Sequence, residues 1–234
     1  MALTGLFLIV FLLEHLIGNF LLLVGPIDFA QYDYFMGHNP LIRIAEFGLF
    51  AFFGFHIVDG LWLWMKNKKA RSQSYAVKGG RHNASWFSRN MHWTGIVILT
   101  FLILHLISFW FLGRLDVNVD LGADANAYSS EVAAMIATAS PDEAQELEVI
   151  HHELLLAKKV ESHFEVWWYS VIYILAMAFV GFHLNHGFQS AFQSLGIDHS
   201  KFKALIKGTG TLVAILIPAG FAAIAMYFLL RPLV

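Results

Sequence analysis

The sequence predicts an all-α membrane protein with five transmembrane helices. Of its 234 residues, 58% are hydrophobic and only 14% are charged, whereas a soluble domain carries roughly 25% charged residues. The mean hydropathy is +0.61. Five stretches are apolar over the length of about 20 residues that a spanning helix needs: residues 4–24, 45–65, 92–113, 166–190 and 208–230. We therefore expect one membrane domain covering residues 1–234, with no soluble domain and no internal repeat.

The first stretch, residues 4–24, could be mistaken for a secretory signal peptide. It lacks the basic n-region and the small-x-small cleavage site of such a peptide, and it is longer than a signal-peptide core. We therefore expect it to be a spanning helix of the mature chain.

The distribution of Lys and Arg between the loops predicts the orientation of the spans. Ten of these residues lie in segments 66–90 and 191–207, and five lie on the opposite side. By the positive-inside rule, the two basic segments face the cytoplasm. The N-terminus is then cytoplasmic and the C-terminus outside.

The outer loop between the third and fourth spans, residues 114–163, is acidic. It carries ten Asp or Glu residues between Asp116 and Glu161. The pattern of residues 130–160 is typical of one or two amphipathic surface helices, broken at Pro141.

The chain has no Cys and a net charge of −2. The absence of Cys excludes disulfides, thiolate-bound iron–sulfur clusters, thiol catalysis and covalent haem attachment. The charge provides no basic field for nucleic acid, so we expect no nucleic-acid partner.

Four of the five predicted spans each contain one histidine at membrane depth: His15, His56, His105 and His183. A single buried His often makes only an interhelical hydrogen bond, but ionisable groups at this depth usually mark function. From the direction of each span, His15 and His105 lie toward the outside, and His56 and His183 lie toward the cytoplasm. Two histidines at one depth on different helices can supply both axial ligands of a haem. We therefore expect four helices to form a bundle around two stacked haems b, which would conduct electrons across the membrane.

Other metal sites fit this pattern less well. Di-iron carboxylate bundles need Glu and Glu-x-x-His ligands on facing helices, and the spans lack them. A His-lined metal-ion transporter without haem remains an alternative. Small residues near the histidines (Gly18, Gly54, Gly181 and Gly187) would let a macrocycle or a neighbouring helix approach closely.

Haem propionates need cationic or hydrogen-bonding partners. Lys66, Arg89 and His92 lie at the cytoplasmic ends of the second and third spans and are candidates for the inner haem, and His186 lies one turn after His183. Asp59, three residues after His56, shares its helix face. It could orient the ligand or a propionate, or bond to a neighbouring helix.

The segments around the four histidines resemble the cytochrome b subunit of five-span, dihaem succinate dehydrogenases and fumarate reductases that use menaquinone. The resemblance covers most of the chain and is carried by four segments: LLEHLIGNF, FGFHIVDGLWLWMKNKKA, WTGIVILTFLILHLISFW and FVGFHLNHGFQSAFQSLGI. In that family the first four spans carry the ligands, and the fifth carries none.

The resemblance implies an inner haem b bound by His56 and His183 and an outer haem b bound by His15 and His105. It also implies a bacterial cytoplasmic membrane and two partner subunits, a flavoprotein with FAD and an iron–sulfur protein. This chain would be the membrane anchor of the enzyme and would not bind the dicarboxylate, since the chain has neither Cys nor a dinucleotide-binding pattern. It would relay electrons between the iron–sulfur subunit and menaquinone.

Two positions depart from the family pattern. Relatives carry an acidic residue near the menaquinone, where this chain has Gly37 or His38. Fumarate reductases carry a Glu two residues before the fourth ligand, where this chain has Gly181. Polar candidates for the quinone site are Asp28, His38, Asn39 and Glu46, although His38 and Asn39 could equally form a turn before Pro40. An anchor of a quinone-linked hydrogenase or formate dehydrogenase is the nearest alternative function.

Overall fold

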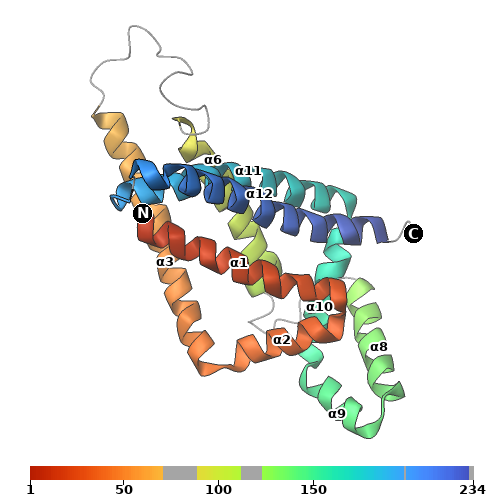
Figure 1. Cartoon of the computed structure of the whole chain (residues 1–234). Helices are drawn as coiled ribbons and strands as arrows, with labels where there is room; N and C mark the ends of the chain where they lie inside the picture. The colour runs from red at the N-terminus through yellow and green to blue at the C-terminus, as the bar shows by residue number, and fades with distance from the viewer. Residues whose placement is uncertain (71–88, 112–122, 198, 232–234) are drawn as a thin grey trace. The chain divides into compact units, whose positions relative to one another are not determined.

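The computed structural model describes residues 1–70, 89–111, 123–197 and 199–231, with the backbone alone for residues 123–129. Every regular element in these ranges is a helix (Figure 1). The basic residues Arg71, Lys78 and Arg81, and residues 114–122 of the acidic outer loop, lie outside the described ranges.

Among the described residues, five helices are long and apolar enough to cross a membrane, as the sequence predicted. They are α1 (Ala2–Val24), α3 (Pro40–Lys69), α6 (Met91–His105) with its π-helical extension η1 (Leu106–Phe111), α11 (Trp167–Ser194) and α12 (Ser200–Leu230). The helices α3 and α12 extend beyond the predicted apolar stretches. Their ends carry lysines, and Lys is a good helix former that continues a helix into a polar environment.

Four shorter helices join the spans: α2 (Pro26–His38), α8 (Ala123–Thr138), α9 (Pro141–Val149) and α10 (His151–Glu165). The helix α2 was not predicted, and the outer segment forms three helices where one or two were expected. The predicted break at Pro141 is present, and a second break occurs at Ile150, whose backbone leaves the helical region.

A capping box begins α9. The Ser140 hydroxyl accepts a hydrogen bond from the Glu143 backbone N–H, and the Glu143 carboxylate accepts one from the Ser140 backbone N–H. This arrangement satisfies two donors that a helix start would otherwise leave unpaired. Hydrogen bonds from the Ser140 side chain and backbone lower the pKa of Glu143.

The described residues divide into two compact units, and each long helix contributes a part to both. Unit 1 comprises Met1–Glu14, Ile44–Thr100 and Leu175–Gly220, and unit 2 comprises His15–Arg43, Phe101–Ile174 and Phe221–Val234.

In unit 1, aromatic rings join α1 to α3, and α3 to α6. Phe7 of α1 stacks on Phe52 of α3 with ring centroids 4.4 Å apart. Trp64 of α3 stacks on His92 of α6 at 5.1 Å. These contacts place the beginning of α1 beside the middle of α3, and the first turn of α6 beside the C-terminal part of α3.

Also in unit 1, α11 packs closely against α12 at Gly181. A Cβ atom at position 181 would lie 2.9 Å from the Ala214 carbonyl oxygen and 3.6 Å from Pro218 Cγ. Pro218 lies inside α12 and has no N–H, so the carbonyl of Ala214, four residues earlier, loses its helical donor. The absence of a side chain at 181 lets the two helices meet over this oxygen.

Unit 2 has an apolar core of its own, formed by α2, α8, α9 and α10. The buried residues are Ala30, Val132, Leu147, Ile150 and Leu154. A hydrogen bond of 2.7 Å from Gln31 to Glu146 also links α2 to α9. Lys158 of α10 lies 3.2 Å from Glu131 and 3.5 Å from Glu161, and Glu161 also pairs with Arg231 at 3.4 Å. Burial alone would lower the pKa of Lys158, but the two carboxylates outweigh it and raise the pKa.

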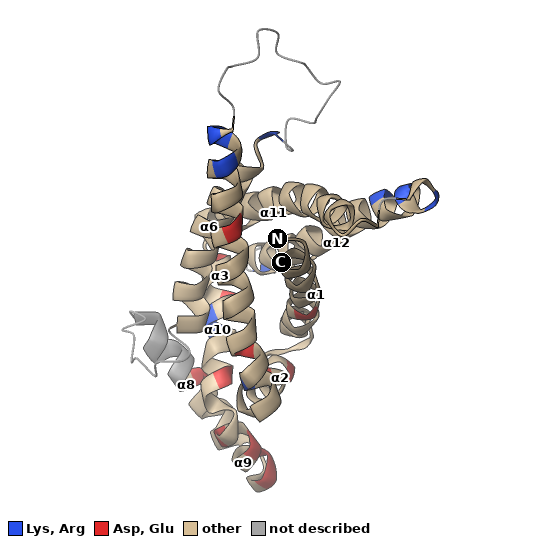
Figure 2. Ribbon diagram, turned by 90° about the vertical axis from the view of Figure 1, so that its left-hand side faces the viewer, with Lys and Arg blue, Asp and Glu red and all other residues tan. Residues whose placement is uncertain are grey.

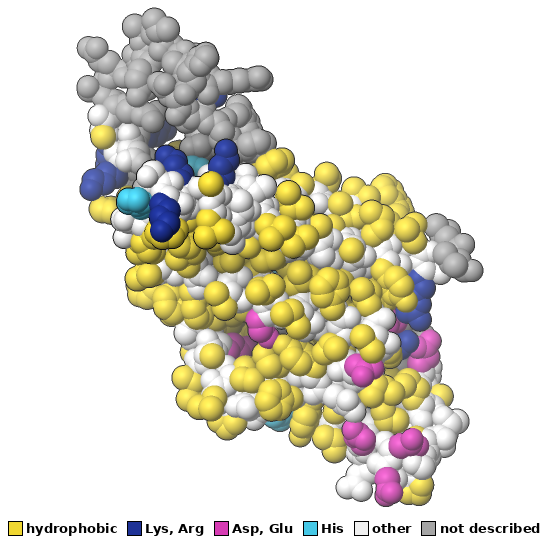
Figure 3. All heavy atoms as spheres, in the orientation of Figure 1, with side chains coloured by type: hydrophobic (Ala, Val, Ile, Leu, Met, Phe, Trp, Pro, Cys, Tyr) yellow, Lys and Arg dark blue, Asp and Glu magenta, His cyan; other side chains and the backbone are white. Residues whose placement is uncertain are grey.

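Charged side chains concentrate at a few helix ends. Figure 2 shows lysines at the end of α3 and the beginning of α12, and acidic residues along α9. Hydrophobic side chains cover much of the visible surface of the long helices (Figure 3). Val10, Leu41 and Phe47 are among the exposed hydrophobic residues of the described chain. Such an exterior matches a lipid environment.

The close approach at Gly181 predicts that Gly181→Ala lowers the free energy of unfolding by about 1–3 kcal/mol, the usual cost of overpacking. The new methyl group would meet the Ala214 backbone, which cannot move aside like a flexible side chain. Thermal unfolding in detergent measures the effect. Gly208→Ala in α12 is the matched control, because a Cβ there meets nothing within 4 Å. Equal midpoints for the two variants would contradict the prediction.

The packing of α10 predicts a pH dependence below the ordinary His pKa of 6.5. Burial lowers the pKa of His163, whose Nδ1–H donates to the Lys159 carbonyl at 2.8 Å. The folded state therefore binds this proton less readily than the unfolded state. The contribution of neutral His163 to stability is complete above pH 6.5 and is lost as the pH falls toward the lowered pKa.

Hydrogen-exchange protection of α10, corrected for intrinsic rates, should therefore decrease between pH 7.5 and pH 5.5. His163→Gln should flatten this dependence, whereas His152→Gln, at an exposed position of the same helix, should leave it intact. Identical pH profiles for the native chain and His163→Gln would refute the assignment.

Candidate functional site

The structure brings the four span histidines together in two pairs. In unit 1, the rings of His56 (α3) and His183 (α11) have centroids 6.3 Å apart. In unit 2, the rings of His15 (α1) and His105 (α6) have centroids 5.8 Å apart. These are the pairs that the depths in the sequence predicted.

The spacing of both pairs fits two imidazoles that ligate one metal from opposite sides. Two metal–nitrogen bonds of about 2 Å, and about 1 Å from each nitrogen to its ring centroid, give centroids roughly 6 Å apart. All four histidines are half-buried. The donor set therefore fits an iron porphyrin with two axial histidines.

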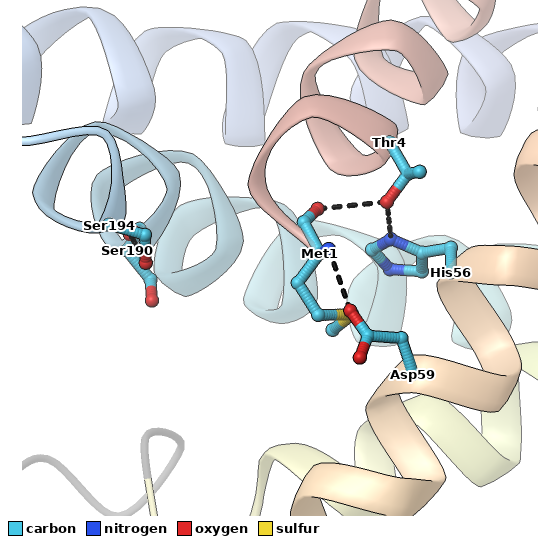
Figure 4. Close-up of polar contacts among 6 residues, drawn as sticks. All are labelled: Met1, Thr4, His56, Asp59, Ser190 and Ser194. Carbon is cyan, nitrogen blue, oxygen red and sulfur yellow. Dashed lines mark hydrogen bonds and ion pairs between the residues drawn. The ribbon is translucent and has the colours of Figure 1, made fainter.

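In unit 1, a threonine hydroxyl contacts the Nδ1 atom of each histidine. Thr4 Oγ1 of α1 lies 3.2 Å from His56 Nδ1 (Figure 4), and Thr94 Oγ1 of α6 lies 3.4 Å from His183 Nδ1. Each hydroxyl donates its own proton to a backbone carbonyl three residues earlier, Thr4 to Met1 at 2.9 Å and Thr94 to Met91 at 2.8 Å.

The direction of these bonds favours one tautomer of both imidazoles. Because each hydroxyl has one proton and donates it to the backbone, its oxygen accepts from the ring. The proton of His56 and of His183 then lies on Nδ1, and Nε2 keeps its lone pair. A neutral imidazole with this tautomer is a metal ligand through Nε2.

The pair in unit 2 has different neighbours at Nδ1. His105 Nδ1 lies 3.0 Å from the Tyr173 hydroxyl, which itself accepts a hydrogen bond from Tyr169 at 3.4 Å. His15 Nδ1 lies 3.4 Å from the Asn19 amide nitrogen, which donates to the His15 carbonyl at 2.7 Å. The outer pair therefore does not share the threonine arrangement of the inner pair.

The backbone changes at His105, where the α-helical part of α6 ends and the π-helical turn η1 begins. Such turns often occur at functional sites. Phe101 and Phe109 lie one turn before and after the histidine, with ring centroids 5.8 Å and 5.4 Å from it. Sequence periodicity gave no indication of the π turn.

Two glycines that the sequence analysis overlooked lie against the imidazoles. A Cβ on Gly5 would lie 3.4 Å from His56 Cε1, and a Cβ on Gly95 would lie 3.8 Å from His183 Cε1. Of the glycines that were singled out, Gly18 adjoins Tyr32, Gly187 adjoins Met91 and Gly181 adjoins α12, while Gly54 has open space around it.

These contacts draw attention to two short sequence patterns that each occur twice. The pattern Met-x-x-Thr-Gly followed by nine residues and His occurs at 1–15 and at 91–105. The pattern Gly-Phe-His-x-x-x-Gly occurs at 54–60 and at 181–187. Each copy of the first pattern supplies a threonine to one pair and a histidine to the other. The first pattern is readable in the sequence and would have identified Thr4, Gly5, Thr94 and Gly95.

The four propionate candidates all belong to unit 1, as do His56 and His183. The Lys66 ammonium lies 5.0 Å from the centroid of the Trp62 ring, in a shallow hollow that Lys69 also lines. His92 stacks on Trp64. Arg89 is exposed, and His186 is half-buried one turn after His183.

The quinone-site candidates fall in both units. Asp28, His38 and Asn39 belong to unit 2, and Glu46 belongs to unit 1. His38 bonds to the Tyr34 carbonyl at 2.9 Å and stacks on its ring. The Asn39 side chain accepts from the Leu41 N–H at 3.0 Å. Both residues thus have local roles at the junction of α2 and α3.

Asp59 bonds to a neighbouring helix. Its carboxylate lies 2.7 Å from the Met1 ammonium at the start of α1 (Figure 4). Of the two roles considered for this residue, the structure shows the interhelical contact.

Within the described ranges, the ligating side chains gather in twos, and no group of three or more His, Asp or Glu residues could hold a metal ion. Comparison of the chain with protein-family models, curated proteins and solved structures finds no match.

Proposed function

We propose that the chain is a dihaem cytochrome b, the membrane anchor of a succinate:quinone oxidoreductase, and that it relays electrons between an iron–sulfur subunit and menaquinone. The observation that carries this proposal is the presence of two histidine pairs, each with the ring spacing of axial haem ligands. A bare metal ion normally takes three or four ligands from the protein, whereas a porphyrin supplies four nitrogens and needs only two more.

The histidines would hold one haem b in each pair, His56 with His183 and His15 with His105. Bound haem would supply a reversible one-electron change at iron. Two protein ligands leave no open coordination position, which favours electron transfer over oxygen chemistry. Lys66, Arg89, His92 and His186 are the candidates to neutralise the propionates of the inner haem.

Quinone reduction also needs proton donors near the carbonyl oxygens. Asp28, His38, Asn39 and Glu46 remain the candidates for this role. Fumarate reductases carry a Glu at the position of Gly181. In this chain, a Cβ atom at position 181 would lie 2.9 Å from the Ala214 carbonyl oxygen of α12. A proton path through that position is therefore incompatible with the packing, and this favours succinate oxidation.

The lysine-rich ends of α3 and α12 would face the cytoplasm and adjoin the iron–sulfur and FAD-containing subunits. The chain would lie in the bacterial cytoplasmic membrane with its N-terminus inside. The clusters and the dicarboxylate chemistry would belong to the partner subunits, because this chain has no Cys. Covalent flavin in the purified complex would support this assignment, and a flavin-free complex would instead favour a hydrogenase or formate dehydrogenase anchor.

The pairing predicts which haem each histidine holds. His56→Ala and His183→Ala should each lose one haem b and leave the same residual species in a redox titration. His15→Ala and His105→Ala should leave the other species. The haem content of the purified complex and the reduced α-band measure the result. A native complex without haem b would end the proposal, and identical residual species from His56→Ala and His15→Ala would refute the pairing.

The contact at Gly5 predicts a second effect on the inner pair. Gly5→Leu should displace the His56 imidazole and reduce the occupancy of one haem, because the new side chain would start 3.4 Å from the ring. Gly48→Leu is the matched control, since it adds the same side chain to a helical glycine with nothing within 4 Å. Haem content should decrease in Gly5→Leu alone. Equal haem content in both variants would contradict the prediction.

A further inference from the structure

We propose that Thr4 and Thr94 are positioning residues that hold both inner ligands with the proton on Nδ1 and thereby lower the reduction potential of the inner haem. The inference rests on the proposed function, because it requires haem between His56 and His183. It assigns a role to two residues that do not touch the iron.

The hydroxyl protons of Thr4 and Thr94 are both used in hydrogen bonds to the backbone. Thr4 donates to the Met1 carbonyl at 2.9 Å, and Thr94 donates to the Met91 carbonyl at 2.8 Å. Both bonds lie within the threonine's own helix and do not depend on the histidine. Each oxygen is thus left as an acceptor that faces an imidazole, at 3.2 Å from His56 and 3.4 Å from His183.

A hydrogen bond at Nδ1 changes the basicity of the imidazole as an iron ligand. An imidazole that donates its Nδ1–H to an oxygen is a more basic ligand through its other nitrogen. A more basic axial ligand stabilises the oxidised iron more than the reduced iron. Hydrogen bonding around axial ligands is one of the means by which proteins set haem potentials.

The effect of these hydrogen bonds on the reduction potential should be limited to the inner haem. Thr4 and Thr94 lie on α1 and α6, the helices that carry the outer ligands His15 and His105. A substitution that merely disturbs these helices would affect the outer pair. A substitution that acts through the hydrogen bond would affect the inner haem alone, because the outer ligands contact Tyr173 and Asn19 instead.

The two threonines differ in burial, since Thr4 is half-buried. Thr94 is only 2% exposed. Each threonine is followed by a glycine, Gly5 or Gly95, whose missing side chain leaves room for the imidazole edge. The same Met-x-x-Thr-Gly sequence provides the arrangement twice, so the two ligands of one iron are held in the same way.

The experiment measures haem content and midpoint potentials in the purified complex for Thr4→Val and Thr94→Val. Valine keeps the shape of threonine and removes the hydroxyl. Both haems should remain, the inner potential should rise in each variant, and the outer potential should not change. Thr4→Ser and Thr94→Ser retain the hydroxyl and should restore the native potential. The His15→Ala background, which should contain only the inner haem, identifies which potential is which.

Thr100→Val is the matched control. Thr100 also lies on α6 and donates to a carbonyl of its own helix, that of Ile96 at 3.0 Å, but it is exposed. This variant should leave both potentials unchanged. If a valine variant does not assemble, Thr94→Ala against Thr94→Ser makes the same comparison.

Two bound haems with an unchanged inner potential in the valine variants would overturn the inference while leaving the proposed function intact. A shift of the outer potential, or serine variants that behave like valine, would also overturn it. A native complex without haem would instead remove the proposed function itself.

Discussion

The structure depends on one constraint, the need of an imidazole in an apolar environment for a partner at each nitrogen. A polar group left without a hydrogen bond in such surroundings costs several kcal/mol. Each of the four span histidines has a side-chain group within 3.4 Å of Nδ1. At His56 and His183, where that group is a threonine hydroxyl that can donate its own proton to the backbone, the second nitrogen is then available to a ligand. Thr4, Thr94 and Tyr173 meet this need, because each places a hydroxyl group beside Nδ1 of a span histidine.

Helix packing determines which other side chains have room beside the paired histidines. The carbonyl that Pro218 deprives of its donor occupies the space beside Gly181, so an acidic side chain two residues before His183 has no room. The small residues at 5 and 95 have the opposite effect, since they leave space beside an imidazole. Glycine thus allows two helices to pack closely at position 181 and leaves room for an imidazole at positions 5 and 95. Only the neighbouring residues distinguish these two roles.

Much of the fold could be predicted because a spanning helix has a strong local signal. A run of about 20 apolar residues has few other stable states, and all five runs are helices. The helix α2 and the break at Ile150 had no comparable signal, because their core forms from residues far apart in the sequence, such as Ala30 and Leu154. The pattern around Thr4 and Thr94 was readable but overlooked, because its two copies are 90 residues apart and share few positions.

The sequence by itself determined that the chain has five apolar stretches of spanning length and that four of them each carry one histidine well inside the stretch. It also determined the pairing by depth, because position along a helix converts directly into depth in a membrane. Only the tertiary structure decided which side chain lies beside Nδ1 of each inner histidine, and that the outer histidines have different neighbours. The physical reason is that the group beside Nδ1 comes from a second helix at His56, His183 and His105.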